Sequence, residues 1–129
     1  MHNLEQIYRR YLACCNEQRF DDLDDFVHPT FRMNGQDTTL PEYKRALSSV
    51  VAAVPDFHWE IQDIVASTEK VAVRILSSGT PVSEWMGMPT GGSFKIEEHA
   101  FYIFENGKMV DTRFIFGMPS IQAELGTKL

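Results

Sequence analysis

Two ionisable side chains near the end of the sequence, Glu97 and His99, are separated by one residue, so an extended strand places them on one face. An imidazole exchanges protons near neutral pH, and a neighbouring carboxylate can orient it or change its pKa. In an apolar pocket, such a pair could remove a proton from an acidic C–H bond or donate a hydrogen bond to a carbonyl. The alternative is that His99 is hydrogen-bonded within the core and that Glu97 lies at the wetter end of the strand.

The strand that carries both residues is predicted to be the first half of a hairpin over residues 94–116. Asn106-Gly107 separates two apolar, aromatic-rich runs and is typical of a two-residue type I′ turn. With this turn, His99 is expected opposite Phe114. The face that carries His99 would form a cavity wall, and we expect it to contain Glu97, His99, Phe101, Ile103, Val110, Thr112, Phe114 and Phe116.

A second charged pair lies on two predicted strands, residues 57–66 and 71–78. The turn between them places Asp63 opposite Arg74, and Trp59 is expected on the same face. The pair could be a structural ion pair on the surface or a polar anchor inside a cavity. The Gly- and Pro-rich segment 79–92 is predicted to be a loop over the mouth of the pocket, with Trp85 as an apolar contact.

The N-terminal half has the 3.6-residue periodicity of helices, which are predicted over residues 4–17, 20–27 and 40–54. Asn3 and Thr39 are predicted to cap the first and third of these helices. Residues 28–36 are predicted to be a short extended piece that leads into a turn at Asn34-Gly35. Tyr11 lies on the apolar face of the first helix. This side chain could donate a hydrogen bond to an oxyanion, as could three other tyrosines, or all four could be amphipathic core residues: Tyr8, Tyr11, Tyr43 and Tyr102. A short C-terminal helix is expected over 119–125.

Helices followed by four antiparallel strands predict an α+β fold, in which N-terminal helices pack on a strongly curved, antiparallel-rich sheet. Such a sheet, closed by helices, forms a cone with an internal cavity. No linker, repeat or low-complexity tract interrupts the 129 residues, so a single domain over 1–129 is predicted.

Composition and charge exclude several classes of function. The formal net charge is −6 and Lys and Arg are scattered, which argues against nucleic-acid and membrane binding. The N-terminus is not typical of a signal peptide, and the adjacent Cys14 and Cys15 predict no disulfide, so we expect a cytoplasmic protein. The histidine spacings match no zinc signature, and no P-loop or dinucleotide glycine pattern is present, so neither a metal nor a cofactor is expected.

The segment VPDFHWEIQDIVASTEKVAVRILSSGT, followed by WMGMPTGG, FKIEEHAFYIFENGKMVD and IQAELG in that order, resembles the SnoaL-like polyketide cyclases (ester cyclases). The resemblance implies the cone fold of the nuclear-transport-factor-like superfamily. It also implies an intramolecular aldol condensation without metal or cofactor, in which an aspartate assisted by a histidine moves protons. His99 stands where the family often has a strand histidine. The acids that the family pattern commonly shows are replaced by Arg113 or Phe114, by Gly117 and by Thr30.

Two hypotheses follow. The first is a cyclase-like enzyme that acts by proton transfer on a hydrophobic, carbonyl-bearing small molecule. His99 would be the catalytic residue, and the pocket would be formed by Tyr11, Trp59, Asp63, Arg74, Trp85, Glu97, Phe101 and Phe114. The alternative is a non-catalytic ligand-binding or dimerisation module of the same fold, since the usual aspartate is not matched. In either case, the aromatic sheet suggests a homodimer that packs through the convex face.

Overall fold

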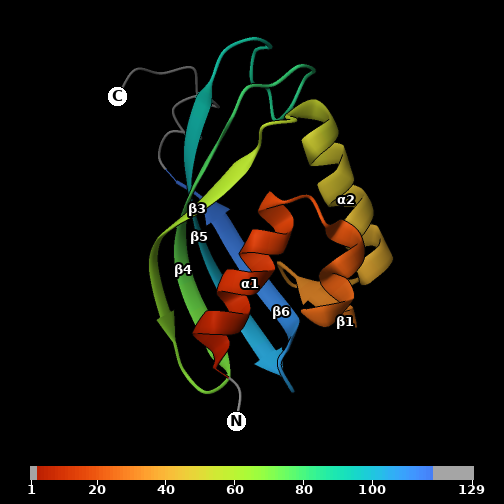
Figure 1. Cartoon of the computed structure of the whole chain (residues 1–129), viewed down its shortest axis with the longest axis vertical. Helices are drawn as coiled ribbons and strands as arrows, with labels where there is room; N and C mark the ends of the chain where they lie inside the picture. The colour runs from red at the N-terminus through yellow and green to blue at the C-terminus, as the bar shows by residue number, and fades with distance from the viewer. Residues whose placement is uncertain (1–2, 118–129) are drawn as a thin grey trace.

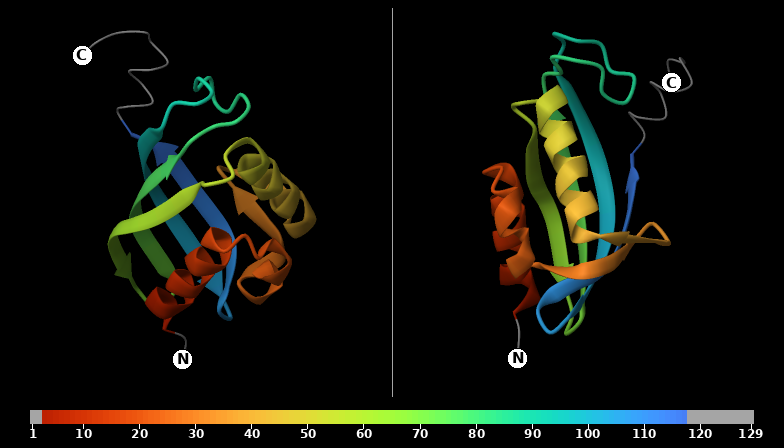
Figure 2. Two further views of the ribbon diagram at one scale, coloured as in Figure 1. Left: turned by 45° about the horizontal axis from the view of Figure 1, so that its top comes forward. Right: turned by 90° about the vertical axis from the view of Figure 1, so that its right-hand side faces the viewer.

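A computed structural model of the chain, which describes residues 3–117, shows helices packed against one six-stranded sheet (Figure 1). The strand order is β2-β1-β6-β5-β4-β3. All neighbours are antiparallel except β1 and β6, which are parallel. The strands are β1 (Val27–Met33), β2 (Gln36–Thr39), β3 (His58–Ala66), β4 (Lys70–Gly79), β5 (Phe94–Glu105) and β6 (Lys108–Phe116). The predicted α+β fold class, with helices on one face of a curved sheet, is confirmed (Figure 2).

The two α-helices begin where the sequence predicts side-chain caps. Helix α1 (Leu4–Asn16) starts after Asn3, whose side chain accepts a hydrogen bond from the backbone N–H of Gln6. Helix α2 (Leu40–Ala53) starts after Thr39, whose hydroxyl accepts from the N–H of Glu42. Between them, the predicted second helix is a 3₁₀-helix, η1 (Phe20–Asp25). Helix α1 packs on β3 and β4, whereas α2 packs on η1 and β1.

Strands β1 and β2 were not predicted from the sequence, which indicated only an extended piece before the turn at Asn34-Gly35. Strand β1 lies in the sheet because it pairs in parallel with β6, which follows it by about 80 residues in the chain. The side chain of Asn34 strengthens this join by accepting a hydrogen bond of 2.9 Å from the N–H of Phe114. The helix predicted over 119–125 lies outside the described residues.

Two β-bulges change which side chains share a face of the sheet, relative to the prediction. In β3, Gln62 has no partner, because Ile61 pairs with Ile75 and Asp63 pairs with Arg74. In β6, Val110 has no partner, because Phe104 pairs with Met109 and Ile103 with Asp111. Side chains alternate between faces along a strand, so one extra residue moves every later side chain to the other face. The predicted turn at Asn106-Gly107 is confirmed, but the predicted register beyond Val110 is wrong by one residue.

The core lies between the helices and the inner face of the sheet. Its fully buried members come from α1, η1 and four strands, and include Tyr8, Leu23, Val27, Val71, Ile75 and Met109. None of the helices in the described part of the chain has the length and apolar character of a membrane-spanning segment.

Asn16 joins the end of α1 to β3 and thereby sets the position of Trp59. Its Oδ1 accepts from the N–H of Trp59 and its Nδ2 donates to the Trp59 carbonyl, both at 2.8 Å. We expect Asn16→Ala to lower the free energy of unfolding by about 1–3 kcal/mol, because two backbone groups lose their partner. Urea unfolding followed by circular dichroism measures the change. The exposed Gln6→Ala, on the same helix, is the control, and an equal effect of both substitutions would contradict the role given to Asn16.

Candidate functional site

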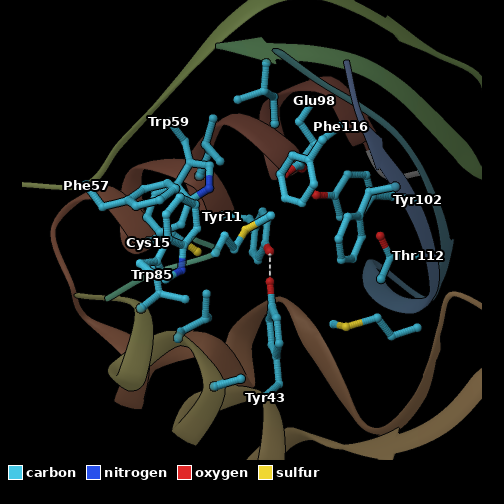
Figure 3. Close-up of a pocket in the computed structure, with 18 residues that line it drawn as sticks. Tyr11, Cys15, Tyr43, Phe57, Trp59, Trp85, Glu98, Tyr102, Thr112 and Phe116 are labelled. Carbon is cyan, nitrogen blue, oxygen red and sulfur yellow. Dashed lines mark hydrogen bonds between the residues drawn. The ribbon is translucent and has the colours of Figure 1, made fainter. Parts of the chain in front are cut away.

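A cavity of about 310 Å³ lies between the two α-helices and the inner face of the sheet (Figure 3). We refer to it as the pocket. Most of the side chains around it are aliphatic or aromatic, and they come from both helices, β1, β3, β4, β5, β6 and the loops before β3 and β5. The lining residues are Tyr11, Leu12, Cys15, Met33, Tyr43, Ala46, Leu47, Val50, Phe57, Trp59, Ile75, Trp85, Met86, Glu98, Tyr102, Thr112, Phe114 and Phe116.

Glu98 supplies the one carboxyl group among the described residues that line the pocket. It lies on β5, with its backbone opposite Phe116 of β6, and its side chain lies beside the Phe116 ring in Figure 3. Burial among apolar side chains disfavours the charged carboxylate and raises the pKa of Glu98 to about 7. At neutral pH this group can therefore both accept and release a proton, which an unperturbed glutamate does rarely.

Tyr11 of α1 and Tyr43 of α2 bring two hydroxyl groups together inside the pocket. The hydroxyls are hydrogen-bonded to each other, as the dashed line in Figure 3 shows. Burial raises the pKa of both phenols well above the usual value, so both remain protonated at neutral pH. On the sheet side, the Thr112 hydroxyl is buried and has no hydrogen-bond partner.

An aromatic cluster closes one side of the pocket. Trp85, in the loop that follows β4, stacks on Phe94 with ring centroids 5.0 Å apart, and its ring meets the edge of Phe57 at 5.2 Å. Phe57 in turn packs on Trp59 at 4.4 Å. The loop is tied to the end of α2, because the N–H of Val82 donates to the carbonyl of Ala53 at 2.8 Å. Flat side chains from three parts of the chain thus face one cavity.

The structure brings some of the residues predicted for the site into the pocket and places the others outside it. Four predicted residues line the pocket: Tyr11, Trp59, Trp85 and Phe114. The other five lie on the outer face of the sheet, away from the helices: Asp63, Arg74, Glu97, His99 and Phe101. The prediction that Glu97, His99 and Phe101 share a cavity wall with Phe114 is wrong, because the bulge at Val110 exchanges the faces. The prediction that Asp63 and Arg74 share a face with Trp59 is also wrong, because the bulge at Gln62 lies between Trp59 and Asp63.

On the outer face, the charged residues form a cluster of their own. The predicted pairing of Asp63 with Arg74 is confirmed, with Nη2 of Arg74 lying 2.6 Å from Oδ2 of Asp63. Arg74 also contacts Glu97, with Nη1 to Oε1 at 3.2 Å, and Nε2 of His99 lies 3.9 Å from Oε2 of Glu97. The His99 side chain is 50% exposed. This cluster is a surface ion-pair network, separated from the pocket by the thickness of the sheet.

Sequence reasoning missed Glu98 as a pocket residue, although β5 contains a signal for it. Thr112, which was expected on the cavity wall, and Tyr43, which was considered as a donor to an oxyanion, both line the pocket. The even-numbered positions of β5 are apolar apart from Glu98, namely Ile96, Ala100, Tyr102 and Phe104, and they are buried. Its odd-numbered positions include the charged or ionisable Lys95, Glu97, His99 and Glu105. A single acid within the apolar face is therefore the exceptional residue, whereas His99 lies among other polar residues.

Among residues 3–117, no three His, Cys, Asp or Glu side chains come together in the manner of a metal site. The two thiols, Cys14 and Cys15, are free and buried, and burial raises the pKa of Cys15 to about 12, so its thiol is not a nucleophile at neutral pH.

Two comparisons with known proteins name the same family. The family model for SnoaL-like polyketide cyclases matches residues 5–124. A SnoaL-like polyketide cyclase from Agrobacterium tumefaciens is 32% identical, with a TM-score of 0.88, over 98% of this chain and 100% of that one. Two Streptomyces structures share the fold. IdmH from Streptomyces antibioticus is 22% identical with a TM-score of 0.81, covering 98% and 100% of the two chains. TsrD from Streptomyces laurentii is 21% identical with a TM-score of 0.83, covering 98% of each. No curated protein matched the sequence significantly.

The raised pKa of Glu98 predicts a pH-dependent stability. Between the ordinary value of 4.5 and about 7, the folded chain keeps a proton on this carboxyl that the unfolded chain has lost. Folding is therefore progressively disfavoured as pH rises through this window. Glu98→Gln lacks this titration. Its free energy of unfolding, relative to that of the wild type, should therefore rise by up to about 3 kcal/mol between pH 4.5 and pH 8.

Chemical unfolding at several pH values checks this expectation. Glu60→Gln, which removes an exposed carboxyl, is the matched control. The burial argument fails if Glu98→Gln and Glu60→Gln behave alike.

Proposed function

Because this chain belongs to the SnoaL-like polyketide cyclase family, we propose that it catalyses proton transfer on a hydrophobic, carbonyl-bearing small molecule, with Glu98 as the general base. The observation that carries the proposal is the single carboxyl group in an otherwise largely apolar pocket, with its pKa raised to about 7. A base of this kind is half ionised at neutral pH and is a stronger base than an ordinary carboxylate.

The proposed step is an enolisation. A carboxylate oxygen of Glu98 takes a proton from the carbon next to a carbonyl, and the electron pair of the broken C–H bond moves to the carbonyl oxygen. The enolate carbon then forms a bond to a second carbonyl carbon of the same molecule, whose oxygen takes up a proton. The Glu98 carboxyl can return the proton that it accepted, so the sum is an intramolecular aldol addition, the bond-forming part of an aldol condensation, and it needs no redox partner.

Glu98 can take the place of the acid that the family pattern implies on β6 and that this sequence lacks there. The resemblance implied an acid near Arg113 or Phe114, and the structure places Phe114 in the pocket and Arg113 on the exposed face. Glu98 lies on the neighbouring strand, and its β6 partner is Phe116, two residues from Phe114 on the same face. A carboxyl from β5 can thus reach the part of the pocket in which an acid from β6 was expected. The catalytic role predicted for His99 requires a pocket position that the outer face does not provide.

We also propose that the chain forms a homodimer through the outer face of the sheet. Three large apolar side chains are exposed there, Val65 by 70%, Phe101 by 57% and Ile115 by 69%. They lie beside the cluster of Asp63, Arg74 and Glu97, which carries both signs of charge and can face a second copy of itself across a two-fold axis. Exposed apolar side chains gathered on one face are typical of a protein–protein contact.

The cytoplasmic location expected from the sequence stays a proposal. The two free, buried thiols of Cys14 and Cys15 are compatible with a reducing compartment. The absence of nucleic-acid and membrane partners likewise remains a prediction from the net charge of −6.

The catalytic proposal can be tested with methyl naphthyl ketone, which has an acidic C–H group and a flat apolar body. We expect the wild type to exchange the methyl protons in deuterated water, at a rate that rises with pH through about 7 as Glu98 ionises. Glu98→Gln should lower the rate roughly 100-fold or more, because the base is removed. Proton NMR of the methyl signal measures the exchange.

Glu60→Gln is the control for loss of a carboxyl and should leave the exchange rate unchanged. Loss of exchange in His99→Ala with full exchange in Glu98→Gln would refute the assignment of the base. Binding of the ketone to the wild type without any exchange would favour the alternative of a non-catalytic ligand-binding module.

The dimer proposal predicts that charge on the outer face separates the subunits. Phe101→Asp combined with Ile115→Asp should convert a dimer to a monomer, because four carboxylates would be desolvated between two copies. Sedimentation velocity measures the change, and Val82→Asp, which replaces an exposed apolar residue in the loop, is the control. A wild type that sediments as a monomer at all concentrations would contradict the proposal.

A further inference from the structure

The pocket contains a pair of hydroxyl groups to which the proposed enolisation by Glu98 assigns no role. We infer that the hydrogen-bonded hydroxyls of Tyr11 and Tyr43 form the site that receives the carbonyl oxygen of the substrate and the negative charge that develops on it. The inference rests on the proposed function and narrows its substrate class to ketones attached to a flat apolar body.

One of the two hydroxyl protons of Tyr11 and Tyr43 is free to be donated to a ligand. Two phenols carry two protons, and the hydrogen bond between Tyr11 and Tyr43 uses one of them. The hydroxyl that accepts this bond keeps its own proton for another acceptor. The thiol of Cys15, on the same helix face as Tyr11, is a weak acceptor and competes poorly with a carbonyl oxygen.

The environment keeps this donor available and strengthens it. Burial raises the pKa of Tyr11 and of Tyr43 well above the usual value, so both are protonated in the pH range in which Glu98 is ionised. Hydroxyls in a chain polarise one another, so a donor that is itself a hydrogen-bond acceptor binds an oxyanion more strongly than a lone phenol does. In a pocket with few polar atoms, such a preorganised donor is worth more than it is in water.

The arrangement lets the pair and Glu98 act on one molecule. Tyr11 and Tyr43 come from the two helices and Glu98 from the sheet, so the oxygen and the acidic C–H group can be contacted from different sides (Figure 3). The aromatic cluster of Phe57, Trp59 and Trp85 bounds the same cavity, and flat rings there favour a flat ligand.

The test measures the carbonyl stretching frequency of methyl naphthyl ketone bound to the protein, by infrared difference spectroscopy at about pH 9. At this pH the Glu98 carboxyl is ionised and cannot donate, whereas the two phenols can. We expect a lower frequency than for the ketone in hexane. The double variant Tyr11→Phe with Tyr43→Phe should lose more than half of this shift, and each single variant, which keeps one hydroxyl, should fall between the double variant and the wild type.

Tyr8→Phe is the matched control, because the Tyr8 hydroxyl is fully buried and lies outside the pocket lining; it should leave the shift unchanged. Retention of the full shift in the double variant would overturn the inference. Loss of the shift in Tyr102→Phe but not in the double variant would do the same, as would failure of the wild type to bind the ketone more tightly than isopropylnaphthalene, which has the same body without the oxygen.

The outcome is independent of the catalytic proposal. Glu98→Gln removes the proposed base but neither phenol, so it should abolish proton exchange and keep the frequency shift. If proton exchange proves insensitive to Glu98 while the double variant still loses the shift, the base is misassigned and the oxygen site stands. If Glu98→Gln loses exchange and the double variant keeps the shift, the base stands and the oxygen site is wrong.

Discussion

The pocket depends on one unpaired residue, Val110 in β6. Next to the turn, Phe104 pairs with Met109; beyond Val110, Tyr102 pairs with Thr112 and Glu98 with Phe116. Without the extra residue, the ladder would continue unshifted and the aromatic residues of β6 would share a face with His99 instead of Glu98. The bulge therefore decides which of two neighbouring ionisable side chains faces the helices. The bulge at Gln62 has the same effect on β3, where it directs Trp59 inward and leaves Asp63 outside.

A carboxyl group in this pocket is costly in its charged form, and the cost shapes its chemistry. Within residues 3–117, Glu98 takes part in none of the ion pairs, which lie on the surface, as for Arg74 with Asp63. With no cation nearby to offset desolvation, the pKa rises to about 7. The polar groups on the helix side, Tyr11 and Tyr43, are neutral, so they add hydrogen-bonding capacity to the pocket without stabilising the carboxylate by charge.

Local signals in the sequence predicted the features that local physics determines. The caps at Asn3 and Thr39, the turn at Asn106-Gly107 and the pairing of Asp63 with Arg74 each follow from a few adjacent residues. Strand β1 escaped prediction because its partner, β6, is distant in the sequence and pairs in parallel. The bulge at Val110 has no local signature, and a register counted from the turn therefore carries its error to every residue beyond it. The polar and apolar alternation along β5 itself, which does not depend on the turn, indicates the correct face.

The consecutive glutamates of β5 show how position on a strand separates two roles. Glu97 and Glu98 have the same chemistry in the unfolded chain, but the pleat directs them to opposite faces. Glu97 lies on the surface, where its Oε1 is 3.2 Å from Nη1 of Arg74. Glu98 meets apolar side chains, which favour its protonated form. A general base at neutral pH needs to change its protonation state there, and the inward glutamate is placed to do so. The family resemblance implies an acid on β6 that this chain lacks. Under the proposal, Glu98 of the adjacent strand β5 supplies the functional carboxyl.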